Sequence, residues 1–328
     1  MRNLRRRLIA GLVFGFLVVL GLALLGDVRQ VVGHLAAFSW GLLPLILAGT
    51  LLNYVLRFFK WHFYLAQIGA RQISWRESAR LFVAGFPLAV TPGKVGEALK
   101  GVWVNQKTGV PVARAVTVVL AERISDGLAV LVLSTLGVIA YPSYWPAFAA
   151  VLAALLAAVA LSQIRPLALA LIGFAERMPG IRRIGHHLRA FYEGTYALFR
   201  PRAFITAVGL GTFAWLGEGI AMYLVLLGLG IPGGWQTLSL AVFILAFSTV
   251  VGAVSALPGG LGAAEASIAG MLGLLMALPA GTAAAATLLI RFATLWFGVG
   301  LGLIVWTFSK DLLALEGQVT QAPWYPGA

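Results

Sequence analysis

The chain has no cysteine, few acidic residues and few charged residues of any kind. The absence of cysteine from all 328 residues excludes disulfides, thiolate nucleophiles and cysteine-ligated metals. Aspartate and glutamate number 11 against 24 lysines and arginines, so the formal net charge is +13. Charged residues make up 11% of the chain, hydrophobic residues make up 60%, and the mean hydropathy is +0.93. These values exclude an ordinary soluble domain and predict an all-α polytopic membrane protein.

Patterns for catalysis, metal binding and nucleotide binding are also absent. His186 and His187 are adjacent, about 100° apart on a helix, and so are unsuited to holding one metal ion. No serine lies in a nucleophile elbow, and no histidine in an expected span has a carboxylate three or four residues away. The basic residues lie in loops beside apolar segments, where membrane topology explains them better than nucleic-acid binding. We therefore expect no enzymatic activity, no cofactor, no metal and no nucleic-acid partner.

Apolar segments long enough to cross a bilayer recur along the chain. A spanning helix needs about 20 residues. The first apolar run follows a basic start and has no small-residue cleavage site, so we expect an uncleaved helix. The expected spans are residues 8–25, 40–65, 112–140, 147–161, 203–229 and 282–308. They predict a single transmembrane domain, residues 1–308, followed by a short cytoplasmic tail, residues 309–328.

Basic residues are concentrated in the loops that we expect on one side of the membrane. Because such loops stay in the cytoplasm, both termini and the connector at residues 164–202 are expected inside. The loops at residues 141–146 and 231–236 carry no charge and are expected outside. Within the connector, residues 184–199 have apolar and basic positions at helical spacing, as in a helix on the inner surface. The sequence thus predicts a multi-pass protein of the inner (cytoplasmic) membrane with cytoplasmic termini.

A Pro-Gly turn interrupts one apolar region before its charged residues begin. Pro92 removes a backbone donor. Gly93 and Gly96 permit backbone angles that other residues avoid. Within lipid, the freed backbone groups must be buried in protein or face a water-filled cavity. We therefore predict a re-entrant helical hairpin over residues 76–106, with its turn at depth.

A second break repeats this pattern in the other half of the chain. It predicts a second re-entrant hairpin over residues 238–278. The residues that make up this break are Pro258, Gly259, Gly260 and Gly262.

Equivalent residues of the two halves are separated by a nearly constant distance. Pro92 and Pro258 are 166 residues apart, and Arg123 and Arg291 are 168 apart. Three spans in each half give the halves opposite orientations. We therefore predict two inverted-topology repeats, each with three spans and one hairpin broken at Pro-Gly, whose tips meet near the midplane. The repeats cover about residues 8–140 and 145–308.

Ionisable residues are rare in the expected spans and hairpins, where each costs about 2.5–3.5 kcal/mol on insertion scales. Glu122 and Asp126 are four apart and share a helix face, and Arg123 lies between them. One interpretation is a set of buried ion pairs that lock the hairpins to the bundle. The other is a polar, basic cavity that holds an anionic headgroup, since arginine pairs bidentately with phosphate. The candidate substrate-binding residues are Arg57, Lys94, Glu97, Lys100, Glu122, Arg123, Asp126, Glu218, Glu265 and Arg291.

Four segments, taken in order, resemble a known family. They are PGKVGEALK at residues 92–100, ERISD at 122–126, LPGGLGAAE at 257–265, and Arg291. Over roughly residues 8–308 the chain resembles the lysylphosphatidylglycerol synthase transmembrane-region family, whose members are also called flippase-like domain proteins. That family includes the flippase half of the multiple peptide resistance factor. The resemblance implies lipid translocation, in which a phospholipid or isoprenoid-linked headgroup crosses the bilayer between the hairpins.

The implied partner is a membrane lipid with an anionic or phosphate-containing headgroup. No nucleotide-binding motif is present, so transport would be passive or driven by an ion gradient. The carboxylates that are candidates for proton coupling are Glu97, Glu122, Asp126, Glu218 and Glu265.

Two departures from the family bear on function. The family usually has arginine where this chain has Lys100, which weakens bidentate phosphate recognition there. Only 20 residues follow Phe308, so we expect no aminoacyl-transferase domain and no lipid-aminoacylating activity. Two alternatives to transport remain open. One is an accessory protein that presents lipid to an envelope-building enzyme, and the other is an intramembrane enzyme that acts on a lipid headgroup.

Overall fold

A computed structural model of the chain describes residues 2–91, 96–140, 145–175, 185–309 and 311–312. These residues form helices and contain no strand, which confirms the all-α prediction. The α-helices are α1 (Arg2–Leu25), α2 (Val28–Ala37), α3 (Leu43–Gln67), α4 (Trp75–Ala84), α5 (Leu99–Thr108), α6 (Val112–Ala140), α7 (Trp145–Ser162), α8 (Arg165–Ala175), α9 (Gly185–Leu198), α10 (Pro201–Gly228), α11 (Trp235–Val254), α12 (Ala263–Met276), α13 (Ala280–Arg291) and α14 (Phe297–Phe308). The shorter elements are the 3₁₀ turns η1 (Trp40–Leu42), η2 (Phe86–Val90) and η6 (Pro258–Gly260), and the π-helical η7 (Phe292–Trp296).

Six helical segments of the described residues are long and apolar enough to cross a membrane, so the chain is a multi-pass membrane protein. Four of them coincide with expected spans, and two are the arms of the second break. The expected spans at residues 112–140 and 147–161 are helical as α6 and α7 but are not among the six. The six segments are Leu8–Leu25, Trp40–Gln67, Pro201–Gly228, Trp235–Val254, Pro258–Met276 and Ala280–Phe308.

The arms of the first break are too short to span a bilayer. Helices α4 and α5 have 10 residues each, which is about 15 Å at 1.5 Å per residue. The hydrocarbon core is about 30 Å thick, so neither helix crosses it, and the five-residue η2 extends only the first arm. These lengths fit the predicted re-entrant hairpin, which stays a prediction. Pro92, Gly93 and Lys94 lie outside the described residues.

The second break has longer arms and a turn that only glycine fits easily. Helix α11 has 20 residues, so by length it could cross the membrane, and this hairpin too stays a prediction. Gly259, Gly260 and Gly262 have φ angles of +61°, +67° and +85°, in the left-handed region that favours glycine. A Cβ atom on Gly260 would lie 2.9 Å from the Cα atom of Gly252, so α11 packs directly on the turn.

The segments that carry the two breaks are in contact. A Cβ atom on Gly259 would lie 3.2 Å from Cγ1 of Val90, the last residue of η2. On its other side Val90 packs against Gly11 of α1, where no side chain would fit. Elements about 166 residues apart in the sequence are therefore held together in the interior of the bundle.

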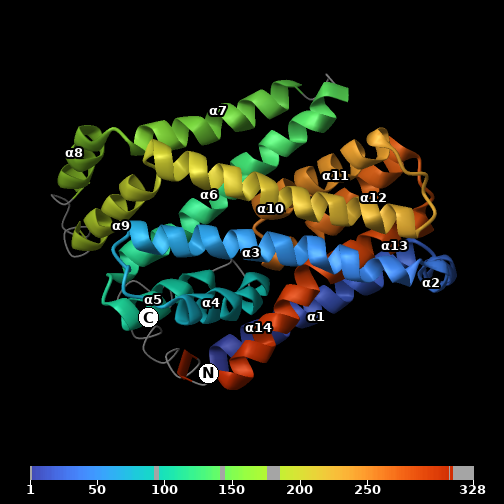
Figure 1. Cartoon of the computed structure of the whole chain (residues 1–328), viewed down its shortest axis with the longest axis horizontal. Coiled ribbons are helices and arrows are strands. Elements are labelled where there is room, and N and C mark those ends of the chain that lie inside the picture. The colour runs from blue at the N-terminus through green and yellow to red at the C-terminus, as the bar shows by residue number, and fades with distance from the viewer. Residues whose placement is uncertain (1, 92–95, 141–144, 176–184, 310, 313–328) are drawn as a thin grey trace.

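Helices α3 and α10 form the antiparallel centre of the bundle (Figure 1). The Ser39 amide before α3 donates to the Gly228 carbonyl at the end of α10. A Cβ atom on Gly49 would lie 2.6 Å from the Gly217 carbonyl oxygen, so the backbones touch. Small residues permit this close approach between membrane helices. Helices α3 and α10 thus run in opposite directions, which fits the predicted inverted repeat, but that repeat stays a prediction.

Helix α1 begins and α14 ends at the same end of the bundle (Figure 1). There Arg80 of α4 donates to both carboxylate oxygens of Asp311 at 3.0 and 2.9 Å, and Lys107 of α5 lies 3.2 Å from Glu77. The hydrogen bonds from Arg80 hold the pKa of the Asp311 carboxyl below its usual range. Lys107 also lies 3.6 Å from Asp311, so α4 and α5 both contact the segment after α14.

The connector between α7 and α10 contains the predicted helix. It forms as α9 (Gly185–Leu198), close to the expected residues 184–199. Helix α9 packs closely against α6, because a Cβ atom on Gly194 would lie 3.1 Å from side-chain atoms of Thr117 and Arg114 on α6. The sequence patterns did not single out two further short helices, α2 and α8.

Candidate functional site

A partly open cavity of about 370 Å³ lies where the two breaks meet the central helices. Its walls are mostly apolar and come from both halves of the chain. Seven of the ten predicted site residues line it. These seven are Arg57, Glu97, Lys100, Arg123, Asp126, Glu218 and Arg291.

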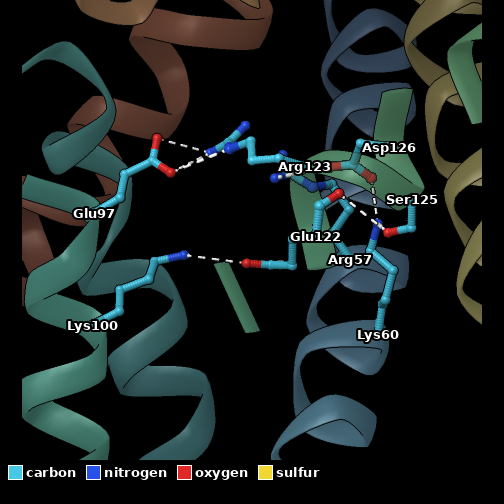
Figure 2. Close-up of polar contacts among 8 residues, drawn as sticks. All are labelled: Arg57, Lys60, Glu97, Lys100, Glu122, Arg123, Ser125 and Asp126. Atoms are coloured by element: carbon cyan, nitrogen blue, oxygen red, sulfur yellow. Dashed lines mark hydrogen bonds and ion pairs between the residues drawn. The ribbon is translucent and has the colours of Figure 1, made fainter. Parts of the chain in front are cut away.

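The pair Arg123–Glu97 joins α6 to the turn that precedes α5 (Figure 2). Arg123 Nη2 donates to both Glu97 carboxylate oxygens at 2.8 Å, and Nε donates to one of them at 3.2 Å. The Glu97 side chain is buried, whereas 42% of the Arg123 side chain is exposed. The remaining terminal nitrogen, Nη1, has no hydrogen-bond partner among the described residues, so this cation can still bind an anion.

The second half contains a matching pair. Arg291, the last residue of α13, donates from Nε to Glu265 at 2.5 Å and from Nη2 to the Gly259 carbonyl at 3.0 Å. Glu265 in turn accepts the Gly262 amide at 2.6 Å at the start of α12. In both halves the carboxylate precedes its arginine by 26 residues. Only 14% of the Arg291 side chain is exposed, so this pair is the more enclosed one.

Asp126 of α6 holds two cations of α3. Lys60 Nζ donates to the Asp126 carboxylate and, at 3.2 Å, to the Ser125 hydroxyl (Figure 2). Arg57 lies 3.5 Å from the other oxygen of Asp126. The Lys60 side chain is completely buried, so its charge depends on this carboxylate. Arg57 also lies over the Trp215 ring at 5.9 Å, which places its guanidinium at the cavity wall.

Lys100 of α5 enters the cavity over aromatic rings. Its Nζ is 5.0 Å from the centre of the Trp61 ring and 3.9 Å from Glu122 (Figure 2). Gly85 makes room for the chain, because a Cβ there would overlap the lysine methylenes. Glu122 is buried and, like Glu265, is not among the cavity-lining residues. Both carboxylates therefore lie behind the wall and hold cations in place.

The predicted polar, basic cavity stays a prediction, but the charges of the described residues around it can be compared. Five cations and five carboxylates gather around the site, so their formal charges cancel. Four of these five carboxylates form ion pairs with the cations across the bundle. The predicted residue Lys94 lies outside the described residues and is not in this count. The cations are Arg57, Lys60, Lys100, Arg123 and Arg291, and the carboxylates are Glu97, Glu122, Asp126, Glu218 and Glu265.

Several site residues were not predicted from the sequence. Tyr54 lines the cavity and donates to the Thr294 carbonyl at 2.5 Å. Thr294 belongs to η7, a π-helical turn directly after Arg291, and such turns are frequent at functional sites. Tyr54 is three residues from the predicted site residue Arg57 and shares its helix face, so this spacing in the sequence pointed to Tyr54. No sequence pattern identified Trp215, because its position at the cavity depends on how α10 packs on α3.

Neither the described residues nor the sequence pattern offers a metal site. No group of three or more histidine, aspartate or glutamate side chains in the described parts of the chain could hold a metal ion.

The chain is similar in sequence to known membrane proteins. The sequence model of the family described as "Lysylphosphatidylglycerol synthase TM region" matches residues 8–302. A "UPF0104 membrane protein" of Methanothermobacter thermautotrophicus (strain Delta H) is 28% identical over 137 residues, which are 39% of this chain. That match covers 40% of the length of the archaeal protein, less than half of it.

Proposed function

We propose that this chain, which belongs to the lysylphosphatidylglycerol synthase TM-region family, moves an anionic lipid headgroup across the cytoplasmic membrane. The headgroup, of a phospholipid or an isoprenoid-linked lipid, passes through the cavity between the two breaks while the acyl or prenyl tails stay in the bilayer. The protein acts as a transporter and catalyses no reaction.

The observation that carries this proposal is the position of Arg123. Its guanidinium is oriented by Glu97, faces the cavity and keeps Nη1 available. An oriented arginine is well suited to bind a phosphate oxygen. Three further cations line the same cavity, so a phosphate can pass from one to another. They are Arg57, Lys100 and Arg291.

The size and lining of the cavity support this assignment. A volume of about 370 Å³ falls at the small end of the range of about 300–1,000 Å³ for small-molecule sites. It accommodates a headgroup rather than a whole lipid. The exposed Val254, which lines the cavity, gives the site an apolar edge.

The proposal is tested by reconstitution into liposomes. Fluorescent phosphatidylglycerol is expected to cross faster than fluorescent phosphatidylcholine, because only the former carries net negative charge. Protein-free liposomes are the control, and dithionite quenching reports the fraction of label in the outer leaflet. If every lipid tested crossed no faster than in protein-free liposomes, the transport proposal would be refuted. Specific lipid retention without movement would instead favour an accessory protein that presents lipid to an envelope-building enzyme.

The proposed topology places both termini in the cytoplasm. Two exposed tryptophans at opposite ends of the bundle, Trp75 at the start of α4 and Trp235 at the start of α11, make matched probes. On intact cells an impermeant maleimide is expected to label Trp235→Cys and to label Trp75→Cys only after permeabilisation. The background is clean because the chain has no cysteine. The reverse labelling pattern would contradict the proposed orientation.

A further inference from the structure

Glu218, near the middle of α10, differs from the other carboxylates of the site. Glu97, Glu122, Asp126 and Glu265 each form an ion pair with a lysine or arginine within 4 Å. Glu218 forms no ion pair and no hydrogen bond with the described residues, although only 5% of it is exposed and it lines the cavity.

The charged and titratable groups around Glu218 come from three helices. Tyr54 and Arg57 of α3, Asp126 of α6 and Arg291 of α13 interact with it electrostatically. Both arginines form ion pairs with other carboxylates, Arg57 with Asp126 and Arg291 with Glu265. Helix α11, which also packs on α10, carries no titratable residue.

The net charge around the cavity depends on whether this carboxylate is ionised. With every group ionised, the five cations and five carboxylates of the described site cancel. An anion that binds this balanced set of charges leaves a net charge of −1 within the membrane, which is costly. Neutralising one carboxylate leaves a net charge of +1, which matches a headgroup of charge −1.

We propose that Glu218 binds the proton that accompanies an anionic headgroup through the cavity. This inference rests on the proposed function and names its coupling ion. A proton from the aqueous phase on one side adds to a carboxylate oxygen, and the headgroup then binds the positive site. On the other side the headgroup leaves, the proton returns to water and Glu218 is again ionised.

The other carboxylates are poorer choices for this role. Protonating Asp126 would leave the completely buried Lys60 without a counter-charge, which is costly. Protonating Glu265 would remove the ion-pair partner of Arg291 beside the second break. At Glu218 a proton relieves an unpaired buried charge and breaks no ion pair found in the structure.

One proton carried with one negative charge makes the cycle electroneutral. In proteoliposomes that contain fluorescent phosphatidylglycerol, a pH difference of one unit is therefore expected to support about a tenfold asymmetry of the lipid. An imposed potassium diffusion potential is expected to have no effect. In Glu218→Gln the pH gradient should produce no asymmetry. Glu193→Gln, on α9 outside the site, is the matched control and should respond like the wild type.

A second measurement separates this inference from the proposed function. Short-chain phosphatidylglycerol is added to the protein in weakly buffered detergent, and proton uptake is measured with a pH dye. About one proton per bound lipid is expected for the wild type and none for Glu218→Gln. Absence of lipid movement in wild-type proteoliposomes would refute the proposed function, yet uptake would still decide the role of Glu218. The inference would be overturned if the pH gradient had no effect on lipid distribution in the wild type. It would also be overturned if proton uptake were unchanged in Glu218→Gln.

Discussion

Arg123→Ala is expected to lower the rate of phosphatidylglycerol movement by about tenfold to a hundredfold in a protein that still folds. A hydrogen bond to a charged group contributes about 1.5–3 kcal/mol, which corresponds to such a factor. The variant removes a cation that faces the cavity, and the measurement is the initial rate in proteoliposomes. Arg165→Ala is the matched control, since Arg165 also pairs with a glutamate at 2.8 Å but lies outside the cavity.

The effect of Arg123→Ala on stability distinguishes headgroup binding from a structural lock. Arg123 is 42% exposed, so its loss leaves Glu97 near water that can partly solvate it. Arg291 is more enclosed, and Arg291→Ala leaves Glu265 buried without its cation, a change that typically costs about 3–5 kcal/mol. Thermal unfolding in detergent should therefore show a larger loss for Arg291→Ala. If Arg123→Ala lost as much stability and its surviving folded fraction still moved lipid normally, Arg123 would be a lock and not a binding residue.

Gly260→Leu is expected to leave almost no folded protein. Gly260 has φ of +67°, a conformation that costs a non-glycine residue about 1–3 kcal/mol. In addition, its Cβ would lie 2.9–3.2 Å from three backbone atoms of Gly252, which cannot move as a side chain can. Folded yield is measured as the monodisperse fraction on size exclusion in detergent.

The matched control for Gly260→Leu is Gly270→Leu in α12. Gly270 is exposed and helical, and a Cβ atom there would have no other atom within 4 Å. Its yield should stay close to that of the wild type. Equal yields from the two variants would show that the turn at the second break is not built as described.

The two halves of the chain differ in how they fill equivalent positions. Lys100 and Glu122 form a buried ion pair in the first half, and 168 residues later Ile268 and Ile290 are both buried in one apolar cluster. Replacing a buried ion pair by apolar residues is often neutral or stabilising. The second half thus packs these two positions with apolar side chains, whereas the first half places an ion pair there.

The composition and the spacing of motifs determined much of this protein in advance. A chain with 60% hydrophobic residues can satisfy its backbone in lipid only as helices or a closed barrel. Helical periodicity and span length favour helices, and the positions of four expected spans follow from hydrophobicity alone. The repeated Pro-Gly breaks and the 168-residue interval between Arg123 and Arg291 pointed to the residues that line the cavity.

Only the tertiary structure decided which charges neutralise one another. Sequence spacing brought Glu122, Arg123 and Asp126 together on α6, but their partners lie on α3, on α5 and in the turn before α5. Pairing of this kind depends on the approach of helices remote in sequence, which small residues such as Gly49 and Gly217 permit. For the same reason the sequence could not single out Glu218. That Glu218 forms no ion pair with the described residues is a property of the space around it, set when α3, α6, α10 and α13 pack together.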